Sequence, residues 1–456
     1  MAINTPSNMR NADAVTGFIL STPKRELPPD VLNAARFGIA DWFGVSLGAA
    51  DQAAIQALKR VVKGWRAQGD AQILLGERTT AAAAALVNGT MAHCLDFDDT
   101  HVGSLAHLSG PTFAAALAVG NECGATATEI MRAFVIGFEV SARLGKGGLG
   151  VAIDGRHIHS TGVFGCFGAA AAAAVLYRLD DLGIRRAMGL AATQVAGLTG
   201  SFGTPGKPFH AGKAGMNGVL AAQMAREGFH GGMNLLESGS GLDSALVQDG
   251  SSKVQALDFT DGWEITRNTF KPYASCLLTH PVIDAARELK EKAQGKAIRK
   301  IRIYVHSLAI QLAGKPTPTT PFEGKFSLAF CAALGLRGRF ANYTDFTPDT
   351  IVDPALQALV AVAELVPVAD MEVTAAELEL DIEGGETLRE RTPLALGNPG
   401  RPMSWDDMRN KFVSLVTPAL DDQSEHLFSC VREFDQQDDM GPLLHMLSGA
   451  SINHKE

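Results

Sequence analysis

Apolar residues recur at intervals of three and four positions through the first half of the chain, from about Val31 to Glu227. This spacing is typical of buried and amphipathic helices. The segments that show it most clearly are 32–45, 79–89, 111–119, 130–140 and 184–192. Many of their positions are Ala or Gly, whose small side chains let helix axes approach closely. The pattern therefore predicts a tightly packed helical region.

The pattern changes near Trp263. Apolar and charged side chains then alternate, as in half-exposed strands, over 297–306, 373–383 and 387–392. Helical spacing intervenes at 281–293, 325–336 and 354–365, and returns after a Gly/Pro turn cluster at 405–416, 424–434 and 440–447. We predict a mainly α fold with a smaller α+β second domain. The expected division is a helical domain over 1–265, an α+β domain over 266–403, and C-terminal helices over 404–456 that return to the first domain.

One helical segment has the length of a membrane span. Residues 157–177 contain no Lys, Arg, Asp or Glu, and about 20 residues cross a bilayer. The segment is mostly Ala and Gly and includes His157, His159, Ser160 and Thr161. We therefore expect a buried helix of a soluble protein. The first residues lack the charged and apolar regions of a signal peptide.

Charge and cysteine content narrow the class of protein. The net charge is −9, from 40 basic and 49 acidic residues, and no long Lys/Arg-rich run suggests a nucleic acid partner. An anionic substrate would need a local basic pocket to attract it. The six cysteines are dispersed without a CxxC pair, which indicates neither a zinc site nor a disulfide framework. We expect a reduced, cytoplasmic setting.

Residues 93–110 concentrate chemically active side chains in apolar surroundings. They are Asp96, Asp98, Asp99, Thr100, His93, His101 and His107. Buried charge is costly unless it is paired or used, and carboxylates beside imidazoles are suited to proton transfer. Asp96 and Thr100 would share a face if the helix continued through them. Helix capping and salt bridges remain alternatives for the acids, as does a divalent metal held with His101, although no second ligand motif accompanies it.

Three further segments carry candidate polar groups. In 157–162, Ser160 or Thr161 is expected to cap a helix whose start binds anions, with His159 beside it. In 203–212, Lys207 lies on a Gly/Pro loop before a helix that is expected to begin at about Ala211, where it could bind a carboxylate. In 270–281, His280 precedes Pro281 at a helix start. The alternative for His159 is a histidine of the capping loop without a chemical role. For Lys207 it is a solvated surface lysine, and for His280 a histidine that only caps or packs.

Taken in order, these segments resemble the MmgE/PrpD family from about Val31 to about Pro418. The residues that carry the resemblance are Leu95-Asp-Phe-Asp-Asp-Thr, His107-Leu-Ser-Gly, Gly137-Phe-Glu-Val, Arg143-Leu-Gly, His159-Ser-Thr-Gly, Gly203-Thr-Pro-Gly-Lys-Pro-Phe-His-Ala-Gly, Lys271-Pro-Tyr, Cys276, His280-Pro and Phe326-Ser-Leu. The resemblance implies a large helical domain, a smaller α+β domain, a homodimer, and neither metal nor organic cofactor.

The resemblance also implies site residues. The catalytic candidates are Asp96, His107, His159, Lys207 and His280, and the substrate-binding candidates are Thr100, Ser109, Lys271 and Phe330. Three positions depart from the family pattern. Leu108 and Ser160 each replace a proline, and Phe330 replaces the tyrosine of the decarboxylase branch, which removes a hydroxyl donor and argues against decarboxylation.

The family includes 2-methylcitrate dehydratase, cis-aconitate decarboxylase and iminodisuccinate epimerase, and the resemblance implies a related reaction. In each, a C–H or C–CO₂⁻ bond beside a carboxylate breaks, which needs a base and cationic groups. Asp96 or a histidine could be the base, Lys207, His107 and His280 could supply positive charge, and His159 could protonate a leaving hydroxyl.

We expect a cofactor-independent lyase of the 2-methylcitrate dehydratase type. The alternatives are an epimerase with two opposed bases, a cis-aconitate decarboxylase, and a silent carboxylate-binding scaffold.

Overall fold

The chain forms two compact units. The computed structural model describes residues 10–237, 239, 241–437 and 439–448. Unit 1 comprises the chain up to Cys94, residues 98–268 and the chain from Met408 onward, and unit 2 comprises residues 95–97 and 269–407. Unit 1 is built mainly of helices, whereas unit 2 combines helices with a four-stranded sheet. The predicted fold class, mainly α with an α+β second part, is confirmed.

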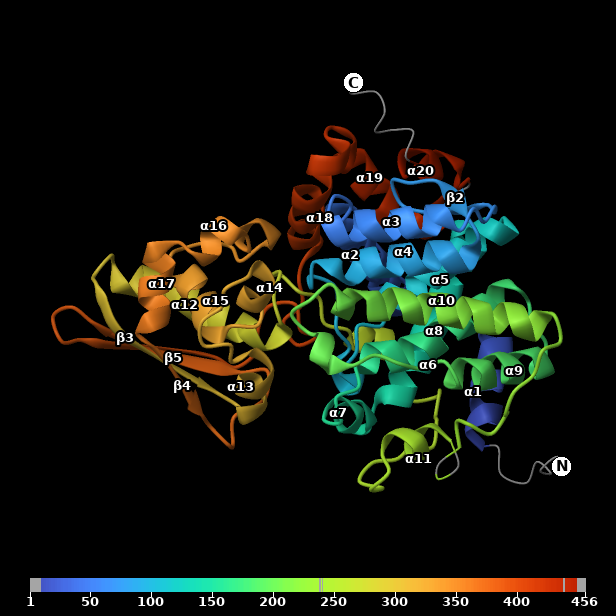
Figure 1. Cartoon of the computed structure of the whole chain (residues 1–456), viewed down its shortest axis with the longest axis horizontal. Helices are drawn as coiled ribbons and strands as arrows, with labels where there is room; N and C mark the ends of the chain where they lie inside the picture. Colours follow the sequence, from blue (N-terminus) through green and yellow to red (C-terminus); the bar gives the residue numbers. More distant parts are fainter. Residues whose placement is uncertain (1–9, 238, 240, 438, 449–456) are drawn as a thin grey trace. The chain divides into compact units, whose positions relative to one another are not determined.

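Five helices form the centre of unit 1 (Figure 1). They are α4 (Ala81–Cys94), α5 (Ser109–Cys123), α6 (Ala127–Gly145), α8 (Ser160–Leu176) and α10 (Gly206–Arg226). Almost every residue of α8 is buried, which explains its uninterrupted apolar composition. No helix among the described residues is both long and apolar enough to cross a membrane.

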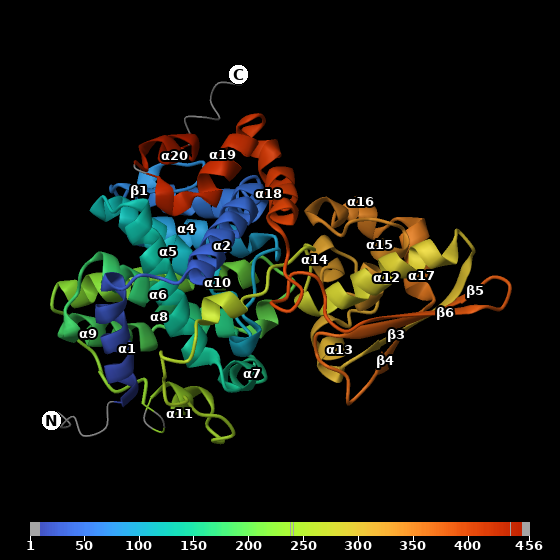
Figure 2. The ribbon, with the colours of Figure 1, turned by 180° about the vertical axis from the view of Figure 1, so that it is seen from behind.

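Shorter and outer elements surround this centre. They are α1 (Arg10–Ser21), α2 (Pro29–Gly48), α3 (Ala53–Gly64), α7 (Leu149–Asp154), α9 (Asp181–Ala192), α11 (Leu242–Leu246), α18 (Trp405–Leu420), α19 (Gln423–Arg432), α20 (Gly441–Met446) and the strand pair β1 (Ala71–Gln72) and β2 (Arg78–Thr79). In Figure 2 the C-terminal α19 lies near the N-terminal α2, and the two helices are in contact.

Main-chain contacts hold α10 against two of the central helices. A Cβ atom at Gly212 would lie 2.1 Å from the carbonyl oxygen of Leu86 in α4, and one at Gly218 would lie 2.6 Å from that of Cys166 in α8. Only glycine fits at such distances, because real Cβ atoms do not come within 3.0 Å of main-chain atoms. The small residues therefore bring α4, α8 and α10 to backbone contact.

The sheet of unit 2 has the strand order β4-β3-β5-β6. Its strands are β3 (Ile298–Val305), β4 (Ala363–Pro367), β5 (Ala376–Ile382) and β6 (Thr387–Thr392). Strands β3 and β4 are parallel and the other neighbours are antiparallel. Alternate residues of β5 are buried in the core of this unit, as the alternating sequence pattern predicts.

Helices pack against this sheet. Helix α12 (His280–Ala293) contacts β5 and β6, and α15 (Leu328–Leu336) contacts α12 and β4. Shorter helices complete the unit: α13 (Ser307–Ala313), α14 (Pro321–Gly324), α16 (Pro348–Ile351) and α17 (Pro354–Ala361). The predicted helix over 354–365 is wrong at its end. It stops at Ala361, and the next residues form β4, because their backbone groups hydrogen-bond to the edge of β3.

Candidate active site

Helix α4 ends at Cys94, just before the Asp-rich segment. Asp96 adopts a left-handed conformation, with φ of 53°, and Asp is among the residues that tolerate it. The expected helix through Asp96 and Thr100 therefore does not form, and the two residues do not share a helix face. The chain instead enters unit 2 for residues 95–97 and returns to unit 1 at Asp98.

Two histidines of unit 1 are held by one carboxylate. Nδ1 of His93, at the end of α4, lies 2.8 Å from Oδ2 of Asp98, and Nδ1 of His107 lies 3.5 Å from the same oxygen. His107 also uses Nδ1 to donate to the main-chain carbonyl of Asp99, at 2.7 Å. A carbonyl oxygen only accepts, so Nδ1 of His107 carries a proton. Thr100 Oγ1 lies 3.3 Å from this nitrogen.

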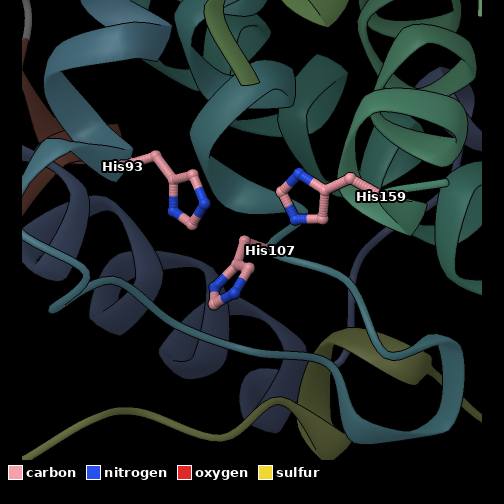
Figure 3. Close-up of side chains that lie close together, drawn as sticks. All are labelled: His93, His107 and His159. Atoms are coloured by element: carbon pink, nitrogen blue, oxygen red, sulfur yellow. The ribbon is translucent and has the colours of Figure 1, made fainter. Parts of the chain in front are cut away.

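His159 joins this pair from the start of α8. Figure 3 shows the rings of His93, His107 and His159 facing one another. The ring centre of His93 lies 4.4 Å from that of His107 and 5.7 Å from that of His159. We call these three side chains the histidine cluster. His93 and His159 are almost fully buried, so the cluster is an interior feature of unit 1.

Ser160 and Thr161 do not cap α8 as expected. The residue at the cap position is His159, and its side chain makes no capping hydrogen bond. Thr161 Oγ1 instead accepts a hydrogen bond from the backbone N–H of His107, at 3.0 Å, and Ser160 donates to the carbonyl of Leu105. These bonds fasten the loop that carries His107 to the first turn of α8, which fixes the position of His107 relative to His159.

Lys207 lies inside the first turn of α10 and not on a loop before it, because α10 begins at Gly206. Lys207 is buried, and its Nζ lies 5.3 Å from the ring centre of Phe202. His210 follows three positions later, on the same helix face. Nδ1 of His210 lies 3.2 Å from Nδ1 of His159. The start of α10 therefore adds a cation and a fourth imidazole beside the cluster.

The electrostatics of the site favour neutral imidazoles at His159 and His210, beside the cation of Lys207. Burial lowers the pKa of His159 well below its usual value, and the positive charges of His93 and Lys207 lower it further. The same causes lower the pKa of His210 to about 4. Burial raises the pKa of Asp154 to about 6, although Lys207 opposes this shift. Lys207 and His93 thus place positive charge beside His159 and His210, which suits an anionic ligand.

Asp99 is the buried acid behind His107. Its Oδ2 accepts hydrogen bonds from Ser109 Oγ and Asn268 Nδ2. Burial raises the pKa of Asp99 to about 7, and the charge of Asp41 adds to the rise, while the two hydrogen bonds oppose it. The hydroxyl of Ser109, a candidate for substrate binding, is thus donated to Asp99.

The remaining candidates lie in unit 2. Lys271 Nζ lies 3.3 Å from Oδ1 of Asp96 and donates to that residue's own carbonyl, at 2.9 Å, with both side chains buried. His280 is fully buried, and its Nε2 donates to the carbonyl of Ser275, at 3.2 Å. Phe330 is fully buried in α15. The structure thus brings Asp96 and Lys271 together as an ion pair.

A metal site with His101 does not form. Nδ1 of His101 is hydrogen-bonded to Ser104 and Nε2 to Glu264, at 2.9 and 3.1 Å. Although burial raises the pKa of Glu264, His101 and Lys146 lower it to about 2, so the glutamate is an anion that holds this imidazole. The cluster is one set that could hold a transition metal, since each of its histidines has a nitrogen within 4.8 Å of the others, and His93, Asp96 and Asp98 form another.

The catalytic and substrate-binding candidates from the sequence did not include three residues at this site: His210, and His93 and Asp98, which were named only as members of the polar segment 93–110. Two signals could have found the histidines. His93 lies near the end of a fully buried stretch of helix whose other polar residues are Asn88 and Thr90, and an imidazole is costly to bury there without a role. His210 is three residues from Lys207, a helical spacing, but the glycine and prolines around Lys207 suggested a loop. Asp98 has no distinct signal among three neighbouring acids.

The chain matches two family models. Residues 13–263 match the MmgE/PrpD N-terminal domain, and residues 273–436 match the MmgE/PrpD C-terminal domain. Curated relatives include the cis-aconitate decarboxylases of Mus musculus and Homo sapiens, each 26% identical over 81% of this chain and 79% of the relative. The cis-aconitate decarboxylase of Aspergillus terreus is 23% identical over 93% of each chain. Together these matches show that the chain belongs to the MmgE/PrpD family.

Proposed function

We propose that this protein is a lyase that removes a proton beside a carboxylate of a small di- or tricarboxylate and eliminates water, as a 2-methylcitrate dehydratase does. One observation carries the proposal: three imidazoles converge in the interior of unit 1 beside the buried Lys207. The family's curated relatives act on a tricarboxylate, according to their names, and break a bond beside a carboxylate. That agrees with the substrate class.

Each group in the cluster has a task in this reaction. Lys207 binds a substrate carboxylate and stabilises the negative charge that develops beside it. His159 is neutral at pH 7 because its pKa is lowered, so it can accept the proton from carbon. We thus propose His159 as the base, whereas the sequence analysis expected it to be the acid that protonates the leaving hydroxyl. The bonding electrons of the C–H bond form the double bond as the C–O bond breaks.

The leaving hydroxide then needs a proton. His93 is our candidate for this donor, because the Asp98 carboxylate, 2.8 Å away, favours its imidazolium form. After the step, His159 holds the proton taken from carbon and His93 has lost one, so transfer through water resets the pair. His107, with Nδ1 protonated, presents its second ring nitrogen as an acceptor to water or substrate.

Two other reactions use the same groups. The relatives favour cis-aconitate decarboxylation, but Phe330 lacks the hydroxyl that the decarboxylase branch carries. Epimerisation of a dicarboxylate would use His107 and His159 as opposed bases. A silent carboxylate-binding scaffold would need none of the proton transfers, and burying four imidazoles and a lysine together would then have no compensating use.

One experiment separates these possibilities. Purified protein is incubated in D₂O with 2-methylcitrate, citrate, cis-aconitate or iminodisuccinate, and ¹H and ¹³C NMR follow each acid. Loss of water with formation of a double bond supports the proposal. Release of CO₂ from cis-aconitate assigns decarboxylation, inversion with deuterium uptake assigns epimerisation, and binding without turnover of any acid assigns the scaffold.

We further propose that the protein works without a metal ion and as a homodimer. The positive charges that lower the pKa of His159 and His210 also repel a divalent cation. The homodimer is the oligomeric state that the resemblance to the family implies. Light scattering coupled to size-exclusion chromatography tests it, with about twice the 48.1 kDa chain mass expected.

A further inference from the structure

A pocket lies in unit 1, between α3 and the β1–β2 pair. Its volume is about 570 Å³, and it is lined by residues from 56 to 79. None of its lining residues belongs to the histidine cluster or to its partners. A pocket of this volume is large enough for a small organic molecule.

The lining of this pocket is strongly basic. Its cations are Lys59, Arg60, Lys63, Arg66 and Arg78, and its acid is Glu77. Five positive charges and one negative charge leave a local charge of +4, on a chain whose net charge is −9. Like charges that share one pocket repel one another, so the arrangement weakens the fold slightly unless an anion offsets it.

The three arginines are not used to hold the fold together. Among the described residues, the guanidinium groups of Arg60, Arg66 and Arg78 make no hydrogen bond or ion pair with the rest of the chain, although the backbones of Arg66 and Arg78 are hydrogen-bonded locally. Arg36 and Arg143 show the contrast, since they pair with Asp435 and Glu139 at 2.6 and 3.1 Å. The guanidinium groups around the pocket therefore remain available to a ligand.

Lys59 adds a cation that the backbone fixes in place. Its Nζ donates to the carbonyls of Leu74 and Leu75, at 2.9 and 3.1 Å. Burial lowers the pKa of Lys59 to about 8, and the charge of Asp51 offsets this only in part. A bound anion would stabilise the charged form of Lys59. Lys63 pairs with Glu77 at 2.5 Å, but both side chains are about two-thirds exposed, and such a pair is weak.

We infer that this pocket binds a small anion that carries at least two phosphate groups. Guanidinium groups match phosphate oxygens in paired hydrogen bonds, which a single lysine cannot do. A charge of +4 suits a ligand with several negative charges. The volume of about 570 Å³ favours a small molecule, such as a diphosphate or a nucleoside polyphosphate, over a polynucleotide. The inference is independent of the reaction at the histidine cluster.

Calorimetric titration of the whole protein tests the inference. Inorganic pyrophosphate, ATP and citrate are each titrated at 50 mM and 150 mM salt. The probe variant is Arg66→Ala/Arg78→Ala, and the control variant is Arg299→Ala/Arg391→Ala, which removes two exposed arginines of unit 2 whose side chains likewise make no hydrogen bond or ion pair within the described residues. All four are exposed, so their removal leaves the folded state intact, which thermal unfolding checks.

We expect pyrophosphate or ATP to bind with a dissociation constant at least tenfold lower than that of citrate at 150 mM salt. The probe variant should bind the phosphate ligand at least tenfold more weakly, and the control variant within twofold of wild type. Tighter binding of ATP than of pyrophosphate would assign a nucleoside ligand, and the reverse an inorganic one. Absence of binding, equal binding of citrate, or equal effects of the two variants would overturn the inference.

Discussion

Nδ1 of His93 lies 2.8 Å from Oδ2 of Asp98, and both side chains are buried in unit 1. The same carboxylate oxygen lies 3.5 Å from His107. One acid therefore orients two of the three imidazoles in the cluster, as the aspartate of a catalytic triad orients its histidine. This places Asp98 among the residues that decide the protonation states at the site.

Asp98→Asn should reduce turnover by about 10²–10⁴-fold, the range of a lost acid or base. The amide keeps the shape of the side chain but no longer stabilises a charged His93. Steady-state kinetics over pH 5–9 measure the effect, and Asp249→Asn, at an exposed ion pair, is the control. Activity within threefold of wild type would show that Asp98 has only a packing role.

Lys207→Ala should raise KM for the carboxylate substrate strongly, because a substrate anion loses its buried cation. The expected loss in kcat/KM corresponds to roughly 2–5 kcal/mol. Lys213→Ala, on the same helix α10, is the matched control and should stay close to wild type. Equal kinetics in both variants would remove Lys207 from the binding site.

Asp96→Asn should lose turnover by about 10²–10⁴-fold if the carboxylate takes part in proton transfer. Asp96→Ala should lose as much turnover. Its free energy of unfolding should also be lower than that of Asp96→Asn by about 1–2 kcal/mol, because alanine is strained in the left-handed conformation at φ of 53°. Urea unfolding and kinetics of both variants check this. An active Asp96→Asn would mean that the residue serves only the turn and the Lys271 pair.

Asp99 should make the protein less stable as the pH rises. Its pKa is about 7 in the folded state against an ordinary 3.8, so between pH 4 and 7 the folded state holds a proton that the unfolded state has released. Stability falls with pH in this window, by up to about 4 kcal/mol in total. Urea unfolding at pH 5 and pH 8 should show a smaller loss for Asp99→Asn than for wild type. Equal pH dependence would contradict the prediction.

Dialysis against a chelator should leave turnover unchanged, because a positive field at the cluster disfavours a divalent cation. Elemental analysis of the dialysed protein confirms that metal was removed. Loss of activity that zinc or manganese restores would show instead that the three imidazoles hold a catalytic metal ion.

Elements with strong periodicity were predictable from the sequence. Helix α8 fills most of the uncharged segment, and α12 begins at His280, directly before a proline, as the sequence predicted. The break after Cys94 was not predictable, because no glycine marks the left-handed position of Asp96. Strand β4 was missed because its pairing partner lies about 60 residues earlier in the chain, in β3. Local patterns do not report such long-range pairing.

At the candidate site, too, some features were predictable from local sequence and others were not. Lys207 and His159 could be selected from local chemistry, since each lies among small or rigid residues. The partnership of His159 with His210, and of His93 with Asp98, depends on how helices meet, which a single sequence does not encode locally. The role that we propose for His159 differs from the one expected from the sequence for a related reason, because its protonation depends on burial and on neighbours from three other segments.

The backbone contacts of Gly212 and Gly218 bear on how this family diverges. Because main-chain atoms set the distances of α10 from α4 and α8, most core side chains can be exchanged over evolution without moving the imidazoles that these helices carry. New substrate preferences would then arise through the connecting loops. Substitution of either glycine would instead push the helices apart and be eliminated by selection.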